Sequence, residues 1–347
     1  MNTMKEQMAP VYATLTAEEA EARYVEMVSD KYVGNKTAVD VLGDVMVKAA
    51  QDDLRIIPKN GVLLLGPPST GKTTLARLIS AFIEVPYVES EANIKDADQL
   101  WAELKKAFAA CPFEGGFPLV EVAPRRYKVP PCMVFIDEAH KLPDRGEWLL
   151  KPTEAKDRTM ILRDGKVVDT RYVFFMLGTT KPDEIDAALL TRLRDISLKP
   201  YSLSEVGEII RRSQPLMGED DRMRLARMAR GIPRVAISYA EEAVLHAERR
   251  RKTVLEAVQV VSDRLGMDQN NLTAEQRAVL YQLKMVGRIA KPRLALAVGV
   301  TPQWLEDRIL PGLWQATEEM PALVRMGSRG VELTEDGESL SSTMAAA

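Results

Sequence analysis

A lysine and a threonine follow two glycines in the sequence, at a spacing that suits the binding of phosphate. Residues 66–74 read GPPSTGKTT, after the apolar run GVLLL and at the start of TTLARLISAFI, a helix-like segment. Glycines let backbone N–H groups approach phosphate oxygens, and the helix start adds the positive end of its dipole. A chance match in a loop is the alternative, but the flanking strand and helix are the context that the pattern requires. The sequence therefore predicts a nucleotide site formed by Gly66, Pro67, Pro68, Ser69, Thr70, Gly71, Lys72, Thr73 and Thr74, in which Lys72 reaches the β- and γ-phosphates and Thr73 holds Mg²⁺.

Two adjacent carboxylates end a second apolar run, CMVFIDEAH. Asp137 and Glu138 would lie at the carboxyl end of a parallel strand, the edge at which the phosphate loop also lies. Asp137 would bind Mg²⁺ through its water shell, and Glu138 would polarise the attacking water. An acidic strand end that faces solvent is the alternative, and the presence of the phosphate loop makes this alternative less favoured. The pair and the loop together predict a site that hydrolyses a nucleoside triphosphate with Mg²⁺.

Single residues elsewhere carry weaker signals of the same chemistry. FFMLGTT ends in Thr179 and Thr180, whose hydroxyls could orient the lytic water, although strands often end in threonine. Arg192 and Arg194 precede a strand-like segment, and an arginine supplied in trans stabilises the transition state of many multi-subunit NTPases. Arg234 starts a helix in ARGIPRVA and could bend back to the phosphates. A surface arginine in a salt bridge is the alternative for each of these arginines.

The elements that must position these side chains follow an alternating pattern up to about residue 200. Apolar strand-like runs alternate with helical patterns, which predicts βαβ units and a parallel sheet with helices on both faces. Residues 1–30 are predicted to form a polar N-terminal segment ahead of this alternating pattern. We predict an α/β core over 1–200, a helical lid over 201–268, and a winged helix over 269–347, made of three helices and the hairpin LVRMGSRGVELT. Thr301 would cap the third of these helices, with Pro302 at its first position.

Composition limits the remaining classes of protein. The 347 residues are 46% hydrophobic and 28% charged, with a formal net charge of −3. No apolar run has the length of a membrane span, and the first residues lack an apolar signal core. The cysteines, Cys111 and Cys132, do not form a disulfide framework, so the expected location is the cytoplasm. The net charge argues against a chain that coats nucleic acid everywhere, but it leaves room for a local basic surface.

The motifs in this order resemble an AAA+ ATPase, and among AAA+ proteins they resemble the RuvB family of hexameric Holliday-junction branch-migration motors. The resemblance covers roughly residues 30–335 and is carried by YVGN, GPPSTGKTT, FIDEAHKL, GTT, LLTRLRD, RGIPR and the LVRMGSRG wing. It implies that Val33 and Gly34 line an adenine pocket and that Thr180 is sensor 1, with Thr179 beside it. Arg192 is then the arginine finger supplied to a neighbouring subunit, and Arg234 is sensor 2.

The sequence departs from the family pattern in three places. Ser69 replaces a glycine that is usual there. The link CPFEGGFPLVEVAPRRYKVPP, residues 111–131, is longer than its equivalent in the family. The segment KDRTMILRDGKVVDTRY matches poorly in the region where RuvB carries its hairpin for RuvA. The resemblance therefore implies a junction-binding partner protein, either RuvA-like or a replacement.

Contact with DNA is expected at the C-terminal hairpin. The third helix carries Glu306 and Asp307, and acidic side chains are repelled by phosphate. Arg325 and Arg329 flank Gly327 and could enter a minor groove without reading sequence. A winged helix that mediates only protein contacts is the alternative.

These observations favour an ATP-driven hexamer that translocates duplex or branched DNA in Holliday-junction branch migration. A loader that uses ATP to assemble on DNA without processive movement is one alternative. A nucleotide-gated DNA-binding scaffold, whose hydrolysis is incidental, is the other. Slow turnover that ignores DNA would favour the scaffold, and turnover stimulated by DNA without strand movement would favour the loader.

Overall fold

The structure, a computed structural model, describes residues 16–51, 60–91, 94–110, 120–154, 156–317, 319–327 and 329–344. The chain divides into two compact units. The described parts of Met1–Gly66 and Gly71–Lys199 form the first unit, and Pro67–Thr70 with the described part of Pro200–Ala347 form the second. The division at Lys199 falls beside the predicted end of the core at residue 200. The boundary predicted at residue 268 lies inside the second unit and stays a prediction.

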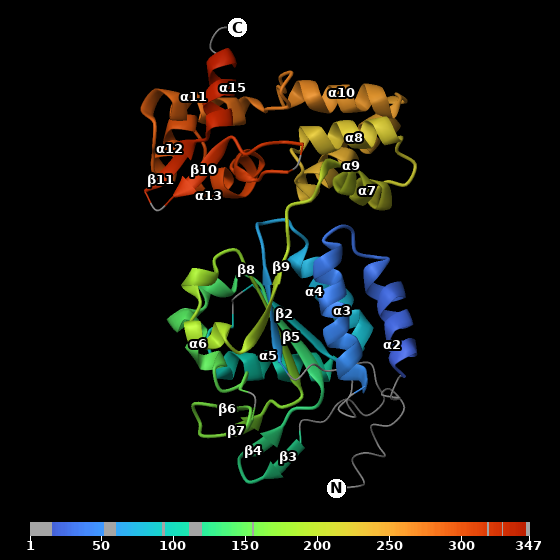
Figure 1. The fold of residues 1–347 in the computed structure, drawn as a ribbon, viewed down its shortest axis with the longest axis vertical. Coiled ribbons are helices and arrows are strands. Elements are labelled where there is room, and N and C mark those ends of the chain that lie inside the picture. The colour runs from blue at the N-terminus through green and yellow to red at the C-terminus, as the bar shows by residue number, and fades with distance from the viewer. Residues whose placement is uncertain are drawn as a thin grey trace. The chain divides into compact units, whose positions relative to one another are not determined.

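A five-stranded parallel sheet forms the centre of the first unit (Figure 1). Its order is β2-β5-β8-β1-β9, with every neighbouring pair parallel. All residues of β5 and β8 are buried, as expected of strands covered on both faces. The strands are β2 (Tyr87–Ser90), β5 (Cys132–Ile136), β8 (Val173–Thr179), β1 (Gly61–Leu65) and β9 (Leu193–Ser197).

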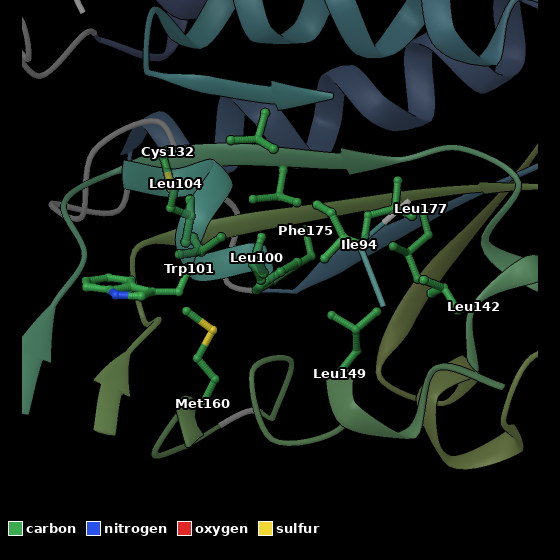
Figure 2. Close-up of a cluster of buried hydrophobic side chains, with 14 of the residues drawn as sticks. Ile94, Leu100, Trp101, Leu104, Cys132, Leu142, Leu149, Met160, Phe175 and Leu177 are labelled. Atoms are coloured by element: carbon green, nitrogen blue, oxygen red, sulfur yellow. The ribbon is translucent and has the colours of Figure 1, made fainter. Parts of the chain in front are cut away.

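Helices cover both faces of this sheet, because successive strand residues point in opposite directions. Val62 and Leu64 of β1 join one apolar cluster with α3 and α4, whereas Leu63 joins a second cluster with α5. Figure 2 shows this second cluster, where Leu100, Trp101 and Leu104 of α5 lie beside Phe175 of β8. The predicted parallel sheet with helices on both faces is confirmed. The helices are α2 (Ala17–Tyr24, continued by a π-helical turn at Val25–Ser29), α3 (Lys36–Gln51), α4 (Lys72–Ile83), α5 (Ala97–Ala109) and α6 (Ala187–Leu190).

A second, four-stranded sheet in this unit is a feature that the sequence reading missed. Its order is β3-β4-β7-β6, with β4 and β7 parallel and the other pairs antiparallel. The long link contributes one hairpin and the poorly matched segment contributes the other; residues 111–119 of the link lie outside the described residues. Met160 and Val168 anchor the sheet in the cluster of α5 (Figure 2 labels Met160). The strands are β3 (Val120–Ala123), β4 (Arg126–Lys128), β6 (Thr159–Ile161) and β7 (Val167–Asp169).

Helices dominate the second unit, and its early part matches the predicted lid. Four helices share one apolar cluster, and the break Gly231-Ile232-Pro233 separates the second from the third, as expected. Pro233 takes the first position of the third helix, where its missing N–H costs nothing. The helices are α7 (Leu203–Ser213), α8 (Glu219–Met228), α9 (Pro233–Arg250) and α10 (Val254–Arg264).

Three helical segments and a hairpin follow in the predicted order. The third segment is interrupted: it starts at α13, capped by Thr301 with Pro302 at its first position, and passes through a π-helical turn into α14. Ile289 forms an isolated antiparallel bridge to Val331 of the hairpin. A final helix, α15, was not predicted. The elements are α11 (Ala274–Val286), α12 (Lys291–Val298), α13 (Pro302–Trp304), the π-helical turn (Leu305–Ile309), α14 (Pro311–Trp314), β10 (Val324–Gly327), β11 (Gly330–Leu333) and α15 (Glu335–Met344).

A buried arginine fastens the lid helices to this C-terminal group. Arg230 has only 5% of its surface exposed and donates hydrogen bonds to the carbonyl oxygens of Gly312 and Pro321. Glu319 adds a link by accepting from the N–H of Leu203, the first residue of α7. Burial lowers the pKa of Arg230 to about 10, which leaves it charged at neutral pH. The second unit is thus held together by a charged group on backbone dipoles as well as by apolar packing.

No described helix combines the length and the apolar character needed to cross a bilayer.

Candidate active site

The phosphate loop leaves β1 and enters α4 in the conformation that anion binding needs. Gly71 precedes α4 with a φ of 86°, and no side chain caps the helix start. The first N–H groups of a helix have no partner within the helix, so uncapped ones can bind an anion. Lys72 is buried, and its ammonium donates to the carbonyl oxygen of Gly66 at 2.9 Å. Thr74 lies exposed on the first turn of α4, and Pro67 accepts from the hydroxyl of Thr70.

Ser69 takes a backbone conformation that usually belongs to glycine. Its φ is 62°, in the left-handed region. A residue with a Cβ pays roughly 1–2 kcal/mol to adopt this region. Ser69 thus has the left-handed backbone that the glycine usual at this position would allow.

The two predicted Mg²⁺ residues meet although they are far apart in the sequence. The hydroxyl of Thr73 donates to Oδ2 of Asp137 at 2.7 Å. Gly178 on the neighbouring strand leaves room for this carboxylate, since a Cβ there would lie 2.7 Å from Oδ1. One hydroxyl and one carboxylate fit Mg²⁺, which usually takes one or two carboxylates and completes its shell with phosphate and water.

Glu138 turns sharply out of β5, in a backbone conformation that is rare for a non-glycine residue. Its φ is 51°, and its N–H donates to Oδ1 of Asp137 at 2.9 Å. Strain of this kind gathers at functional sites. The carboxylate is partly exposed and lies 3.4 Å from Nε2 of His140. His140 stands in the motif FIDEAHKL, but the sequence reading gave it no role.

The two threonines at the end of β8 differ in their surroundings. Thr179 is fully buried and its hydroxyl lies 3.1 Å from Nδ1 of His140. Thr180 follows β8 and is half-buried. The assignment of sensor 1 to Thr180 stays a prediction. Thr179 is the residue whose hydroxyl contacts His140, in the turn after β5.

Asn35 fixes the segment predicted to line the adenine pocket. Gly34 and Asn35 both have a positive φ, 71° and 47°, which forms a tight turn after Val33. The Asn35 side chain accepts from the N–H of Lys199 at 2.6 Å and donates to its carbonyl oxygen at 3.1 Å. The turn is therefore tied to the end of β9. Asn35 was visible in the motif YVGN, but its role depends on a contact with a distant residue.

Arg192 lies at the wrong end of the sheet to serve its own phosphate loop. The next residue, Leu193, pairs with Gly61 at the start of β1, whereas the loop follows Leu65 at the other end. At about 3.3 Å per residue, that separation is about 13 Å along the strand. The Arg192 guanidinium donates to the carbonyl oxygen of Ala188 at 2.8 Å and lies 3.9 Å from Glu154. The sequence predicted Arg194 ahead of the strand. In the structure, Arg194 lies within β9 and is exposed.

The remaining predicted residues belong to the second unit. Arg234 is exposed at the second position of α9. Arg325 of β10 donates to Glu332 of β11 at 2.6 Å, while Arg329 is exposed in the turn between the strands. Glu332 also binds Arg288, and the hydrogen bond from Arg288, followed by that from Arg325, holds the pKa of Glu332 below its usual range. Part of the positive charge predicted for the hairpin is thus neutralised within the chain.

The sheet order, the phosphate loop and the Thr73–Asp137 pair define an ATP hydrolase with an AAA+ fold. Residues 62–201 match the family model "ATPase family associated with various cellular activities (AAA)". The ATP-dependent zinc metalloprotease FtsH of Thermus thermophilus is 31% identical over 61% of this chain, but over only 34% of its own length. The AAA+ part alone is therefore shared with proteins of other functions.

More extensive similarity points to one kind of AAA+ protein. The Holliday junction branch migration complex subunit RuvB of Prochlorococcus marinus is 29% identical over 82% of this chain and 79% of its own. The solved RuvB Holliday junction branch migration motor of Thermotoga maritima matches with a TM-score of 0.67 and 21% identity, over 92% of this chain and 98% of its own. Residues 62–201 thus match an AAA ATPase domain, and the chain resembles RuvB over most of its length, as predicted.

Proposed function

We propose that this chain is an ATP-driven motor that moves duplex DNA at Holliday junctions. The observation that carries the proposal is the extent of the likeness to RuvB, which covers about nine tenths of the fold. A hydrolysis site is joined in one chain to a lid and a C-terminal group of helices with a hairpin. DNA as the substrate also supports a cytoplasmic location.

The hydrolysis steps are assigned to residues of the first unit and of the phosphate loop. Lys72 and the loop N–H groups bind the β- and γ-phosphates, and Val33 and Gly34 line the adenine pocket. Thr73 and Asp137 hold Mg²⁺, which supplies charge neutralisation at the phosphates. Glu138 polarises the attacking water, and Thr180 senses the γ-phosphate. Their support is the geometry of the loop, the 2.7 Å contact of Thr73 with Asp137, and the position of Glu138 at the same sheet edge.

A hexamer is proposed because the position of Arg192 suits the site of a neighbouring subunit better than its own. It lies about 13 Å along the strand from its own phosphate loop, so it is suited to a site on another subunit. An arginine that enters a neighbouring site stabilises the charge of the transition state. Arg234 is proposed as sensor 2 within its own subunit.

The four-stranded sheet is the proposed docking site of a junction-binding partner, either RuvA-like or a replacement. The hairpin β6–β7 occupies the region where the RuvA-binding hairpin of RuvB was expected, and β3–β4 extends it. Val122 and Ile161 are 57% and 67% exposed, so apolar surface is available for a partner.

Strand exchange on a synthetic four-way junction tests the proposed function. The purified protein is incubated with ATP and Mg²⁺, and junction movement and ATP turnover are measured in parallel, with and without the partner. Movement that requires ATP, and that Lys72→Ala abolishes, is the expected result. Turnover stimulated by DNA without movement would support the loader instead. Slow turnover that ignores DNA would support the scaffold.

A further inference from the structure

His140 joins two parts of the catalytic site that come from different strands. It lies in a 3-10 helical turn, Ala139–Lys141, directly after the Asp137-Glu138 pair. Its side chain is 6% exposed, so both ring nitrogens are away from bulk water. Nδ1 lies 3.1 Å from the hydroxyl of Thr179 at the end of β8, and Nε2 lies 3.4 Å from the carboxylate of Glu138.

The groups on the two sides of the His140 ring favour one tautomer. The Thr179 oxygen accepts from the backbone N–H of Lys181 at 3.0 Å. The Thr179 hydroxyl can still donate its own hydrogen to Nδ1 of His140, and the Glu138 carboxylate accepts but does not donate, so the tautomer that suits both neighbours has Nδ1 as the acceptor. A neutral imidazole with an acceptor at Nδ1 carries its proton on Nε2, the nitrogen that faces Glu138. The contacts therefore run from Lys181 through Thr179 and His140 to the Glu138 carboxylate.

The neutral ring is consistent with its surroundings. Burial is the largest influence and lowers the pKa of His140, while the charge of Glu138 acts in the opposite direction. A neutral ring in this tautomer presents its Nε2–H to the Glu138 carboxylate, 3.4 Å away, and its Nδ1 to the Thr179 hydroxyl.

We propose that His140 is a positioning residue, which orients the Glu138 carboxylate toward the lytic water and couples its position to the end of β8. His140 does not touch the substrate in this scheme. Phosphate contact at Thr179–Thr180 shifts the hydroxyl that His140 is bonded to, and the ring passes that shift to Glu138. The inference rests on the proposed role of Glu138 in activating water.

Two substitutions separate the two bonds of the ring. In His140→Asn the short amide can still bond to Thr179 but cannot reach Glu138. In His140→Gln the longer amide places an N–H group near the position of Nε2, so it can still bond to Glu138. We expect kcat of ATP hydrolysis to fall about 10- to 100-fold in His140→Asn, the range seen when groups that orient a ligand are removed. His140→Gln should recover part of this loss, and KM and the nucleotide Kd should stay within about twofold of the parent in both.

Thr179→Val removes the hydroxyl without changing the shape of the side chain. If the chain of hydrogen bonds acts as a unit, the double variant His140→Asn/Thr179→Val should be no slower than the slower single variant. If the two losses in kcat multiply in the double variant, the two residues act independently, and the proposed coupling is overturned. A parental kcat in His140→Asn, or an equal loss in kcat, nucleotide affinity and Tm, would overturn the positioning role.

Glu138→Gln, measured in parallel, separates this inference from the proposed function. If Glu138→Gln keeps its turnover, the assigned role of Glu138 fails, and the inference fails with it. If Glu138→Gln loses its turnover while both His140 variants hydrolyse ATP like the parent, only the inference fails. Adding His140→Asn to Glu138→Gln should leave the residual turnover unchanged, because His140 acts through that carboxylate.

Discussion

The two units of the chain use their buried polar side chains in different ways. In the first unit, side chains that follow β1, β5 and β8 bond to one another, as Thr73 does to Asp137 and His140 does to Thr179. In the second unit, the buried Arg230 bonds to backbone carbonyls, and the arginines of the hairpin are exposed. Chemistry on phosphate needs fixed distances between functional groups, whereas grip on DNA of any sequence needs accessible positive charge. Substitutions in the first unit should therefore act on nucleotide binding and rate, and those in the second on stability, DNA affinity and salt dependence.

The largest effect is expected in the first unit. Lys72→Ala should abolish ATP binding, because it removes the ammonium that reaches the β- and γ-phosphates. Glu138→Gln should retain binding and lose turnover, because the amide cannot polarise water. Nucleotide affinity from fluorescence titration and the rate of phosphate release check both variants. Loss of binding in both would show that Glu138 is needed for structure and would remove the division of roles.

Arg192→Ala should lower hydrolysis by about 10³- to 10⁵-fold, the usual worth of an arginine finger, with ATP binding nearly intact. Arg194→Ala is a matched control, since Arg194 is an exposed arginine two residues further along the same segment. The rate of phosphate release by each variant makes the comparison.

Mixing experiments test whether Arg192 acts on a neighbouring subunit. A Lys72→Ala subunit cannot hydrolyse ATP but still carries its own Arg192. It should therefore restore activity to Arg192→Ala neighbours. An absence of rescue at every mixing ratio would contradict a site shared between subunits.

Contiguous motifs made much of the site predictable from sequence. The loop at 66–74 and the pair Asp137-Glu138 each follow a buried strand, and parallel strands bring such ends to one edge. That rule brings Thr73 to Asp137 across 64 positions. His140, Asn35 and Arg230 were overlooked, although all three stand in motifs that were read. Their roles depend on contacts with residues remote in sequence, and a single sequence does not show such contacts.

The four-stranded sheet escaped prediction for a different reason. Its strands are only three or four residues long and mix charged with apolar residues, so no alternating pattern stands out. Two of them come from the long link and two from the segment that matched poorly. Their pairing depends on the apolar cluster around α5, in which Met160 and Val168 lie. Local propensity gives little information when the tertiary packing decides the structure.

A smaller effect, on stability, is expected at Arg230. Arg230→Ala removes two hydrogen bonds and leaves the carbonyl groups of Gly312 and Pro321 without this donor. The free energy of unfolding should fall by about 1–3 kcal/mol. The free energy of unfolding of Arg230→Lys should lie between those of the parent and of Arg230→Ala, since an ammonium lacks the planar fork of guanidinium. Urea unfolding followed by circular dichroism measures the change. Arg227→Ala on α8 is the control, because Arg227 is exposed. An equal loss in both would show that the helix, and not the buried contact, sets the stability.

The smallest effect concerns the hairpin, and it decides whether the second unit grips DNA there. Arg325→Ala with Arg329→Ala should weaken binding at every sequence tested and reduce the salt slope by about one to two, roughly one per lost phosphate contact. Glu332→Gln should act in the opposite direction, because Glu332 now holds both Arg325 and Arg288. Binding isotherms at several salt concentrations give the slopes. ATP turnover without DNA should be unchanged in both variants, because the hairpin contributes no residue to the hydrolysis site. Stimulation by DNA and junction movement should fall together in the double variant. If that variant binds and moves DNA like the parent, the hairpin is not the grip. The exposed Arg125, in the turn before β4, and Arg126, the first residue of β4, would then be the next residues to replace.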